Sequence, residues 1–248
     1  MHGFPDASAP PYVAIITETD ACDSEARMEA TLESIQSAVQ SNHVALVSVR
    51  VVGEGSQEFS DRVVELIDSL VRIATKNRFW VVVSSDLIGE AVKGGAHGIH
   101  VKEKHRGLIP EIRELFPFDP LIGTSAHSVQ SALDAWSLYR PSYYFVGTCF
   151  LTESHPEKSE GKLEGPKLPG QVALALKKVC TDGNPATVFA IGGINESNCH
   201  EPVSRYGADG VATIRAVLQA DDPSLVVQNM VSAMQKGEED VIVSSEKL

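Results

Sequence analysis

Short apolar runs rich in β-branched residues alternate with segments of helical periodicity along most of the chain. Tyr12–Glu18 reads YVAIITE and His43–Val51 reads HVALVSVRV, whereas Ser60–Lys76 repeats its apolar residues every three or four positions. Continuous apolar runs of this length are typical of strands buried on both faces, and the three-to-four spacing predicts an amphipathic helix. The other predicted strands are Phe79–Ser84, Gly98–Val101, Leu121–Ser125, Tyr143–Gly147, Thr187–Ile191 and Gly210–Ile214. The other predicted helices are Asp23–Gln40, Leu87–Gly94, Leu108–Phe116, Val129–Tyr139, Gly170–Val179, Asn195–Tyr206 and Pro223–Gln235.

This strict alternation of strand and helix predicts a parallel sheet covered by helices. Eight such units favour a single (βα)8 TIM barrel over a doubly wound open sheet, which usually has five or six strands. We place the barrel at residues 11–238, with flexible tails at 1–10 and 239–248.

Composition and charge narrow the functional classes. The 248 residues contain 21 Lys and Arg against 33 Asp and Glu, a net charge of −12, which argues against a nucleic-acid partner. Apolar residues make up 43% of the chain, but no run is long enough to cross a membrane. The four cysteines have neither zinc-site nor redox-pair spacing, so we expect reduced thiols. We therefore expect a cytoplasmic protein, leaving open import into an organelle and assembly into a homodimer.

In a barrel of this kind the active site is built from the carboxyl ends of the strands and the loops that follow them. Gly192 and Gly193 separate a predicted strand from a predicted helix, where backbone N–H groups can approach an anion closely. Arg215 follows the next strand and could add a charged contact. We favour a phosphate site here over a plain tight turn.

His127 is the best candidate for a general acid and base, because it follows a strand end and imidazole titrates near neutral pH. Asp86, directly after an apolar run, could bind a metal, orient a base or cap the next helix. The polar stretch 152–168 is longer than usual for this position, so we interpret it as an active-site lid rather than an unstructured loop.

An ordered set of motifs resembles the thiamine-phosphate synthase family, including its TenI-type thiazole tautomerase branch. The resemblance covers roughly Tyr12 to Gln235 and rests on TSAHS at 124–128, YFVG at 144–147 with Phe150 and Thr152, AIGGI at 190–194, and GADGV at 207–211. It implies a (βα)8 barrel that acts on a thiazole phosphate. In the synthase, Mg²⁺ assists the departure of pyrophosphate from a hydroxymethylpyrimidine diphosphate, whereas in the tautomerase a histidine moves a proton.

Carried over by position, the resemblance assigns most of the binding residues. Its thiazole phosphate contacts fall on Gly193, Ile214 and Arg215, where Arg215 replaces a serine. Gly192 precedes Gly193 in the AIGGI motif. Ser125 matches a serine that contacts the diphosphate, Arg50 matches an arginine of the second-strand motif, and Ser85 replaces an asparagine. Thr152 matches a threonine of the loop after the sixth strand, and the lysine that follows aligns with His155 or, after an insertion, with Lys158. A second lysine is replaced by Val52. The first metal carboxylate falls on Asp86, and the second falls on His105 and is therefore missing.

These departures weaken the diphosphate and metal half of the family's site and leave the thiazole phosphate half intact. We therefore predict a thiazole tautomerase with His127 as its acid and base and without a required cofactor. One alternative is a thiamine-phosphate synthase using Mg²⁺, with Asp86 as a metal ligand. Another is a non-catalytic barrel that senses the same ligand.

Overall fold

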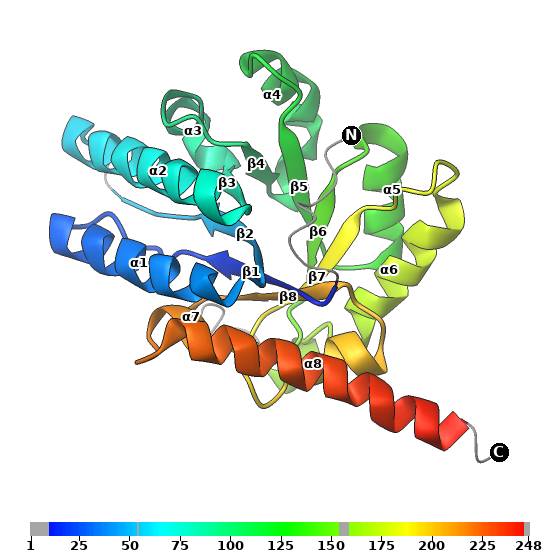
Figure 1. Cartoon of the computed structure of the whole chain (residues 1–248). Helices are drawn as coiled ribbons and strands as arrows, with labels where there is room; N and C mark the ends of the chain where they lie inside the picture. Colours follow the sequence, from blue (N-terminus) through cyan, green and yellow to red (C-terminus); the bar gives the residue numbers. More distant parts are fainter. Residues whose placement is uncertain (1–9, 54, 154–158, 246–248) are drawn as a thin grey trace.

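Eight parallel strands close into a barrel in chain order, and the last strand pairs with the first (Figure 1). The computed structural model describes residues 10–53, 55–153 and 159–245, with side chains described up to residue 236. This confirms the predicted (βα)8 architecture. The strands are β1 Tyr12–Ile16, β2 Val44–Val49, β3 Trp80–Ser84, β4 Gly98–Val101, β5 Leu121–Ala126, β6 Tyr143–Val146, β7 Thr187–Ile191 and β8 Gly210–Thr213.

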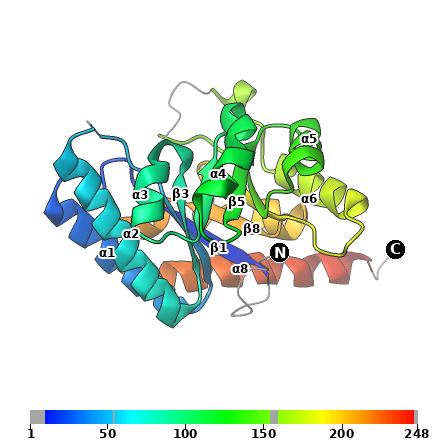
Figure 2. The same cartoon turned by 90° about the horizontal axis from the view of Figure 1, so that it is seen from above.

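Helices surround the barrel and cover the outer face of its strands (Figures 1 and 2). Side-chain hydroxyls fix the starts of three of them: Ser24, Ser56 and Ser128 each accept a hydrogen bond from a backbone N–H in the first turn. The α-helices are α1 Glu25–Ala38, α2 Gln57–Asn77, α3 Ile88–Lys93, α4 Ile109–Leu115, α5 Val129–Tyr139, α6 Lys167–Val179, α7 Arg215–Leu218 and α8 Pro223–Ser245. Short 3₁₀ segments occupy Val39–Ser41, Ser85–Leu87, Glu103–Leu108 and Glu160–Lys162.

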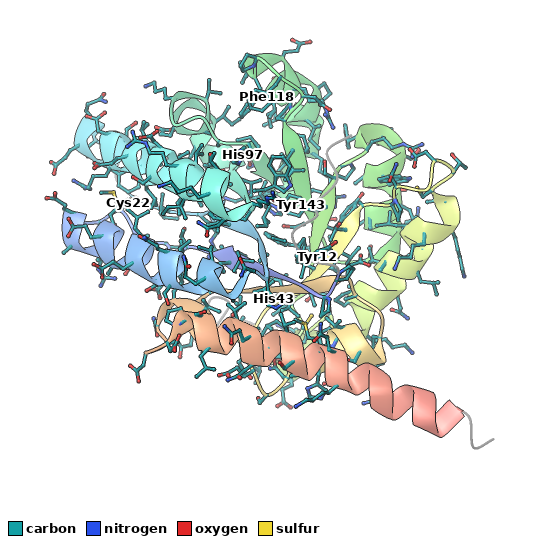
Figure 3. All side chains as sticks on the ribbon, viewed as in Figure 1. Tyr12, Cys22, His43, His97, Phe118 and Tyr143 are labelled. Carbon is teal, nitrogen blue, oxygen red and sulfur yellow. The ribbon has the colours of Figure 1, made fainter. Side chains whose placement is uncertain are left out.

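The inside of the barrel contains an apolar cluster that includes Ile16, Leu46, Val82, Tyr143, Phe145 and Phe189. Tyr143 lies at the centre of the molecule, whereas Cys22 and Phe118 lie toward its outside (Figure 3). Gly123 gives Tyr143 its space, because a Cβ atom at Gly123 would stand 1.9 Å from Cζ of the tyrosine ring.

The predicted helix Asn195–Tyr206 is not formed. The segment contains turns and a short π-helical piece, Glu201–Arg205. Two local features explain the difference. Pro202 cannot donate a backbone hydrogen bond, and the Asn195 side chain accepts hydrogen bonds from both the backbone N–H and the hydroxyl of Ser197.

The last helix is longer than predicted. Helix α8 continues beyond the predicted end at Gln235 to Ser245, into the segment 239–248. No glycine or proline follows Gly237 to end the helix. Most of the predicted N-terminal tail lies outside the described residues. In the described part of the chain, no helix combines the length and apolar character needed to cross a membrane.

Candidate active site

A cavity of about 1350 Å³ opens at the carboxyl ends of the strands. All eight strands, or the residues that directly follow them, contribute to its wall. Ser48, Ser84, His100 and Ser125, on the four successive strands β2 to β5, supply polar groups to one side of the cavity. The cavity therefore combines an apolar floor with polar walls, as small-molecule sites commonly do.

Most of the predicted site residues line this one cavity: Arg50, Asp86, Ser125, His127, Thr152, Gly192, Gly193, Ile214 and Arg215. Ser85 does not. Its hydroxyl is buried without a hydrogen-bond partner, and the neighbouring Ser84 lines the cavity instead. Lys158 lies outside the described residues, so its place at the site stays a prediction.

The ends of β7 and β8 form a tightly packed corner. Gly192 and Gly193 have φ values of +101° and +65°, and a Cβ at Gly193 would lie 2.3 Å from the Leu151 carbonyl oxygen. Only glycine fits there without strain. The Thr213 hydroxyl donates to the Ile194 carbonyl and joins the two loops. Arg215 lies at the same end of the cavity, 3.5 Å from a carboxylate oxygen of Glu153. The backbone N–H of Asn195, two residues after Gly193, is not available to an anion, because it donates to the Asn198 side-chain oxygen.

His127 follows β5 and is half-exposed in the cavity wall. Its Nδ1 lies 2.6 Å from the Gly147 carbonyl oxygen. A carbonyl only accepts hydrogen bonds, so Nδ1 carries a proton and Nε2 is the nitrogen that can take up or release one. The tautomer that general acid–base chemistry needs is thus fixed by the backbone carbonyl of Gly147, the residue that follows β6.

Two carboxylates that the sequence analysis did not assign flank this imidazole. Glu103 Oε2 is 3.8 Å from His127 Nε2, and Glu164 Oε1 is 3.4 Å from His127 Nδ1. The other oxygen of Glu164 accepts from the Thr148 N–H at 2.5 Å. Position after β4 was the signal available for Glu103. Glu164 belongs to the stretch 152–168 that we interpreted as a lid.

His100, in β4, lies deeper in the cavity and links its own strand to β5 and β6. Its ring stacks on Phe145 with centroids 4.6 Å apart, and its nitrogens lie 3.1 Å from the Tyr143 hydroxyl and 3.0 Å from the Ser125 hydroxyl. Burial, reinforced by the charges of Arg50 and Lys102, lowers the pKa of His100 to about 3. The neutral ring orients Ser125 and does not act as a proton donor at neutral pH.

Cationic side chains gather on the wall formed by β2 and β4. Arg50, Lys102 and Lys104 all line the cavity there. Burial lowers the pKa of Arg50, and the described part of the chain offers its guanidinium no carboxylate partner. This wall could therefore receive an acidic group of a ligand.

The residues present do not fit the Mg²⁺ site implied by the resemblance. The Asp86 carboxylate is bonded to the Lys102 ammonium, which places a positive charge where a metal ion would bind. Asp86 does not cap a helix either, since α3 begins without a side-chain cap. His105, at the expected position of the second carboxylate, does not line the cavity. Across the described ranges, no group of three or more His, Cys, Asp or Glu side chains could hold a metal ion.

Comparison with known proteins identifies relatives over most of the chain. A thiamine-phosphate synthase of Listeria welshimeri is 29% identical over 204 residues, covering 82% of this chain and 92% of that protein. A thiamine-phosphate synthase of Helicobacter pylori is 27% identical over 206 residues, covering 83% and 87%.

A solved structure with the same fold is the thiamine phosphate pyrophosphorylase of Pyrococcus furiosus. It is 20% identical, with a TM-score of 0.69, over 91% of this chain and 96% of that one. The sequence model described as thiamine monophosphate synthase matches residues 13–217, which is most of the barrel. The chain therefore belongs to the thiamine monophosphate synthase family.

Proposed function

We propose that this chain binds a phosphorylated thiazole in the cavity and that His127 moves a proton on this compound, the reaction of a thiazole tautomerase. The observation that carries the proposal is the fixed tautomer of His127: its Nδ1 is held by the Gly147 carbonyl, and its Nε2 is available to a substrate. Family membership supports a phosphorylated heterocycle as the ligand class. The phosphate would lie at the Gly192–Gly193 corner beside Arg215.

The test is binding of a thiazole carboxylate phosphate by calorimetry, followed by NMR detection of solvent deuterium entering the ring. We expect binding and exchange in the wild-type protein. Arg215→Gln should bind about 10- to 100-fold more weakly, because a charged hydrogen bond is worth about 1.5–3 kcal/mol. Lys76→Gln, a change at the far end of α2 outside the cavity lining, is the matched control. Failure of the wild-type protein to bind the compound would contradict the proposal.

Thiamine-phosphate synthase is the second candidate, and the names of the relatives favour it. Arg50, Lys102 and Lys104 add a specific observation, because this cationic wall suits the diphosphate of a second substrate. The assay is pyrophosphate release from the hydroxymethylpyrimidine diphosphate in the presence of thiazole phosphate and Mg²⁺. Rapid release of pyrophosphate would replace the tautomerase proposal with this one.

Metal binding separates the two candidates without an activity assay. We expect weak Mn²⁺ binding in the wild type, because the Lys102 ammonium already neutralises Asp86. Lys102→Met should bind Mn²⁺ more tightly, and the double variant Lys102→Met/Asp86→Asn should lose that gain. Calorimetric titration with Mn²⁺ measures all three proteins. Tight wild-type binding that Asp86→Asn abolishes would favour the synthase.

A further inference from the structure

Glu103 is a carboxylate held in place at the cavity wall. One of its oxygens, Oε1, accepts a hydrogen bond from the Ser131 hydroxyl at the start of α5. Its other oxygen, Oε2, stands 3.8 Å from His127 Nε2, the nitrogen that is available for proton transfer. Both residues line the same cavity. The carboxylate is thus anchored at one end and faces the reactive nitrogen at the other.

Glu103 is not needed to hold its neighbour Arg106. The Arg106 guanidinium donates to the Thr124 hydroxyl at 3.0 Å, to the Ser131 carbonyl and hydroxyl at 2.9 Å each, and to the Ser125 carbonyl. Its distance to Glu103 is 3.8 Å, which is longer than a hydrogen bond. Arg106 therefore fastens the segment after β4 to β5 and α5 through bonds that do not involve Glu103. The free oxygen of Glu103 has no comparable structural duty.

The gap between Glu103 Oε2 and His127 Nε2 is too long for a direct hydrogen bond. It is short enough for both atoms to contact one small heterocyclic substrate. A shift of a proton from one atom of the substrate to another requires one group that removes a proton and one that delivers a proton. A single imidazole would have to move between the two substrate atoms to do both. Two groups on one wall of the cavity can each act on one atom without moving.

We propose that Glu103 is a second catalytic residue, which works with His127 as a proton-transfer pair on the substrate. The inference rests on the proposed tautomerase function. With His127 protonated, the Glu103 carboxylate removes a proton from one atom of the substrate while His127 Nε2 delivers its proton to another. Glu103 then holds a proton and His127 is neutral. Water takes the proton from Glu103 and supplies one to His127 Nε2, which restores the starting pair, so the substrate gains one proton and loses one, and no co-reactant is consumed.

Other charged groups face this pair. Glu164 lies on the Nδ1 side of His127, and Arg106 lies beside Glu103. Glu164 also fastens its own segment to the end of β6 through the Thr148 amide, so replacing it would change the loop as well as the charge. Glu103→Gln is the cleaner substitution, because the amide oxygen can still accept from Ser131.

The decisive experiment compares Glu103→Gln with wild type for binding of the thiazole carboxylate phosphate and for deuterium incorporation into its ring. We expect exchange to fall about 100-fold or more with unchanged affinity, as removal of a general acid or base usually does. Ser131→Ala removes the hydrogen bond to Glu103 Oε1 but keeps the Glu103 carboxylate, so the rate of deuterium exchange should fall less than in Glu103→Gln. Glu58→Gln, an exposed carboxylate paired with Arg62 on α2, should match wild type.

Each result decides between the two proposals. Full exchange by Glu103→Gln, alongside an active wild type, overturns the role of Glu103 and leaves the tautomerase proposal standing. A Glu103→Gln protein that loses affinity as much as exchange also overturns it, because Glu103 would then be a binding residue. A wild-type protein that binds the compound without exchanging ring protons overturns both proposals.

Discussion

Replacing His127 by alanine is expected to lower ring-proton exchange by about 10²–10⁴-fold, the usual contribution of general acid–base catalysis. The change removes the imidazole that lines the cavity and whose Nδ1 proton is held by the Gly147 carbonyl. The phosphate corner at β7 and β8 is untouched, so affinity for the thiazole carboxylate phosphate should stay the same. The measurement is deuterium incorporation by NMR, paired with calorimetry on the same protein samples.

His200→Ala is the matched control, because His200 is exposed and does not line the cavity. Undiminished exchange in His127→Ala would contradict the assignment of His127. Tight binding without exchange in the wild type would instead fit the ligand-sensing barrel that the sequence left open. In that case, the substitution should leave the affinity unchanged.

Replacing Phe189 by alanine is expected to cost about 3–5 kcal/mol of unfolding free energy, the range measured for large aromatic residues in protein cores. Phe189 is completely buried inside the barrel, and its ring contacts those of Tyr143, Phe145 and Tyr12 with centroids 5.9–6.5 Å apart. A cavity there would remove the floor beneath the active site, since rigid surroundings refill only part of the lost volume.

Urea unfolding followed by circular dichroism measures this loss. Phe189→Leu, which keeps most of the side-chain volume, should cost clearly less than the alanine variant. Phe118→Ala is a suitable control, because Phe118 is half-exposed and lies outside the barrel (Figure 3). Equal losses for the alanine variants at positions 189 and 118 would show that the interior cluster does not dominate barrel stability.

The strands and most helices were predictable from local sequence because each depends on its own pattern. A run such as YVAII at β1 or WVVVS at β3 is apolar throughout, since a strand in this barrel is covered on both faces. Helix α2 carries the apolar stripe of residues that pack against the barrel. The helix prediction failed where side chains compete with the helix for backbone hydrogen bonds. The segment after β7 turns instead of forming the predicted helix because Asn195 and Pro202 favour other backbone hydrogen bonds.

The site was only partly predictable. His127 and the Gly192–Gly193 corner follow strand ends, and barrel closure brings all strand ends to one face. The pairing of Asp86 with Lys102 could not be predicted, because it depends on where two side chains that follow the adjacent strands β3 and β4 meet. The contact of Glu164 with His127 could not be predicted either, because the two residues are 37 positions apart in the chain.

The sequence alone therefore determined the order of strands and helices, the closed parallel barrel that this order requires, and the end of the barrel where the chemistry lies. Tertiary structure decided which charges are available there. It neutralised Asp86 with Lys102, placed the neutral His100 ring against Ser125, and set Glu103 and Glu164 on either side of His127. The physical reason is that periodicity reports which face of an element is buried, whereas the state of a charged group depends on neighbours that only folding brings within a few ångströms.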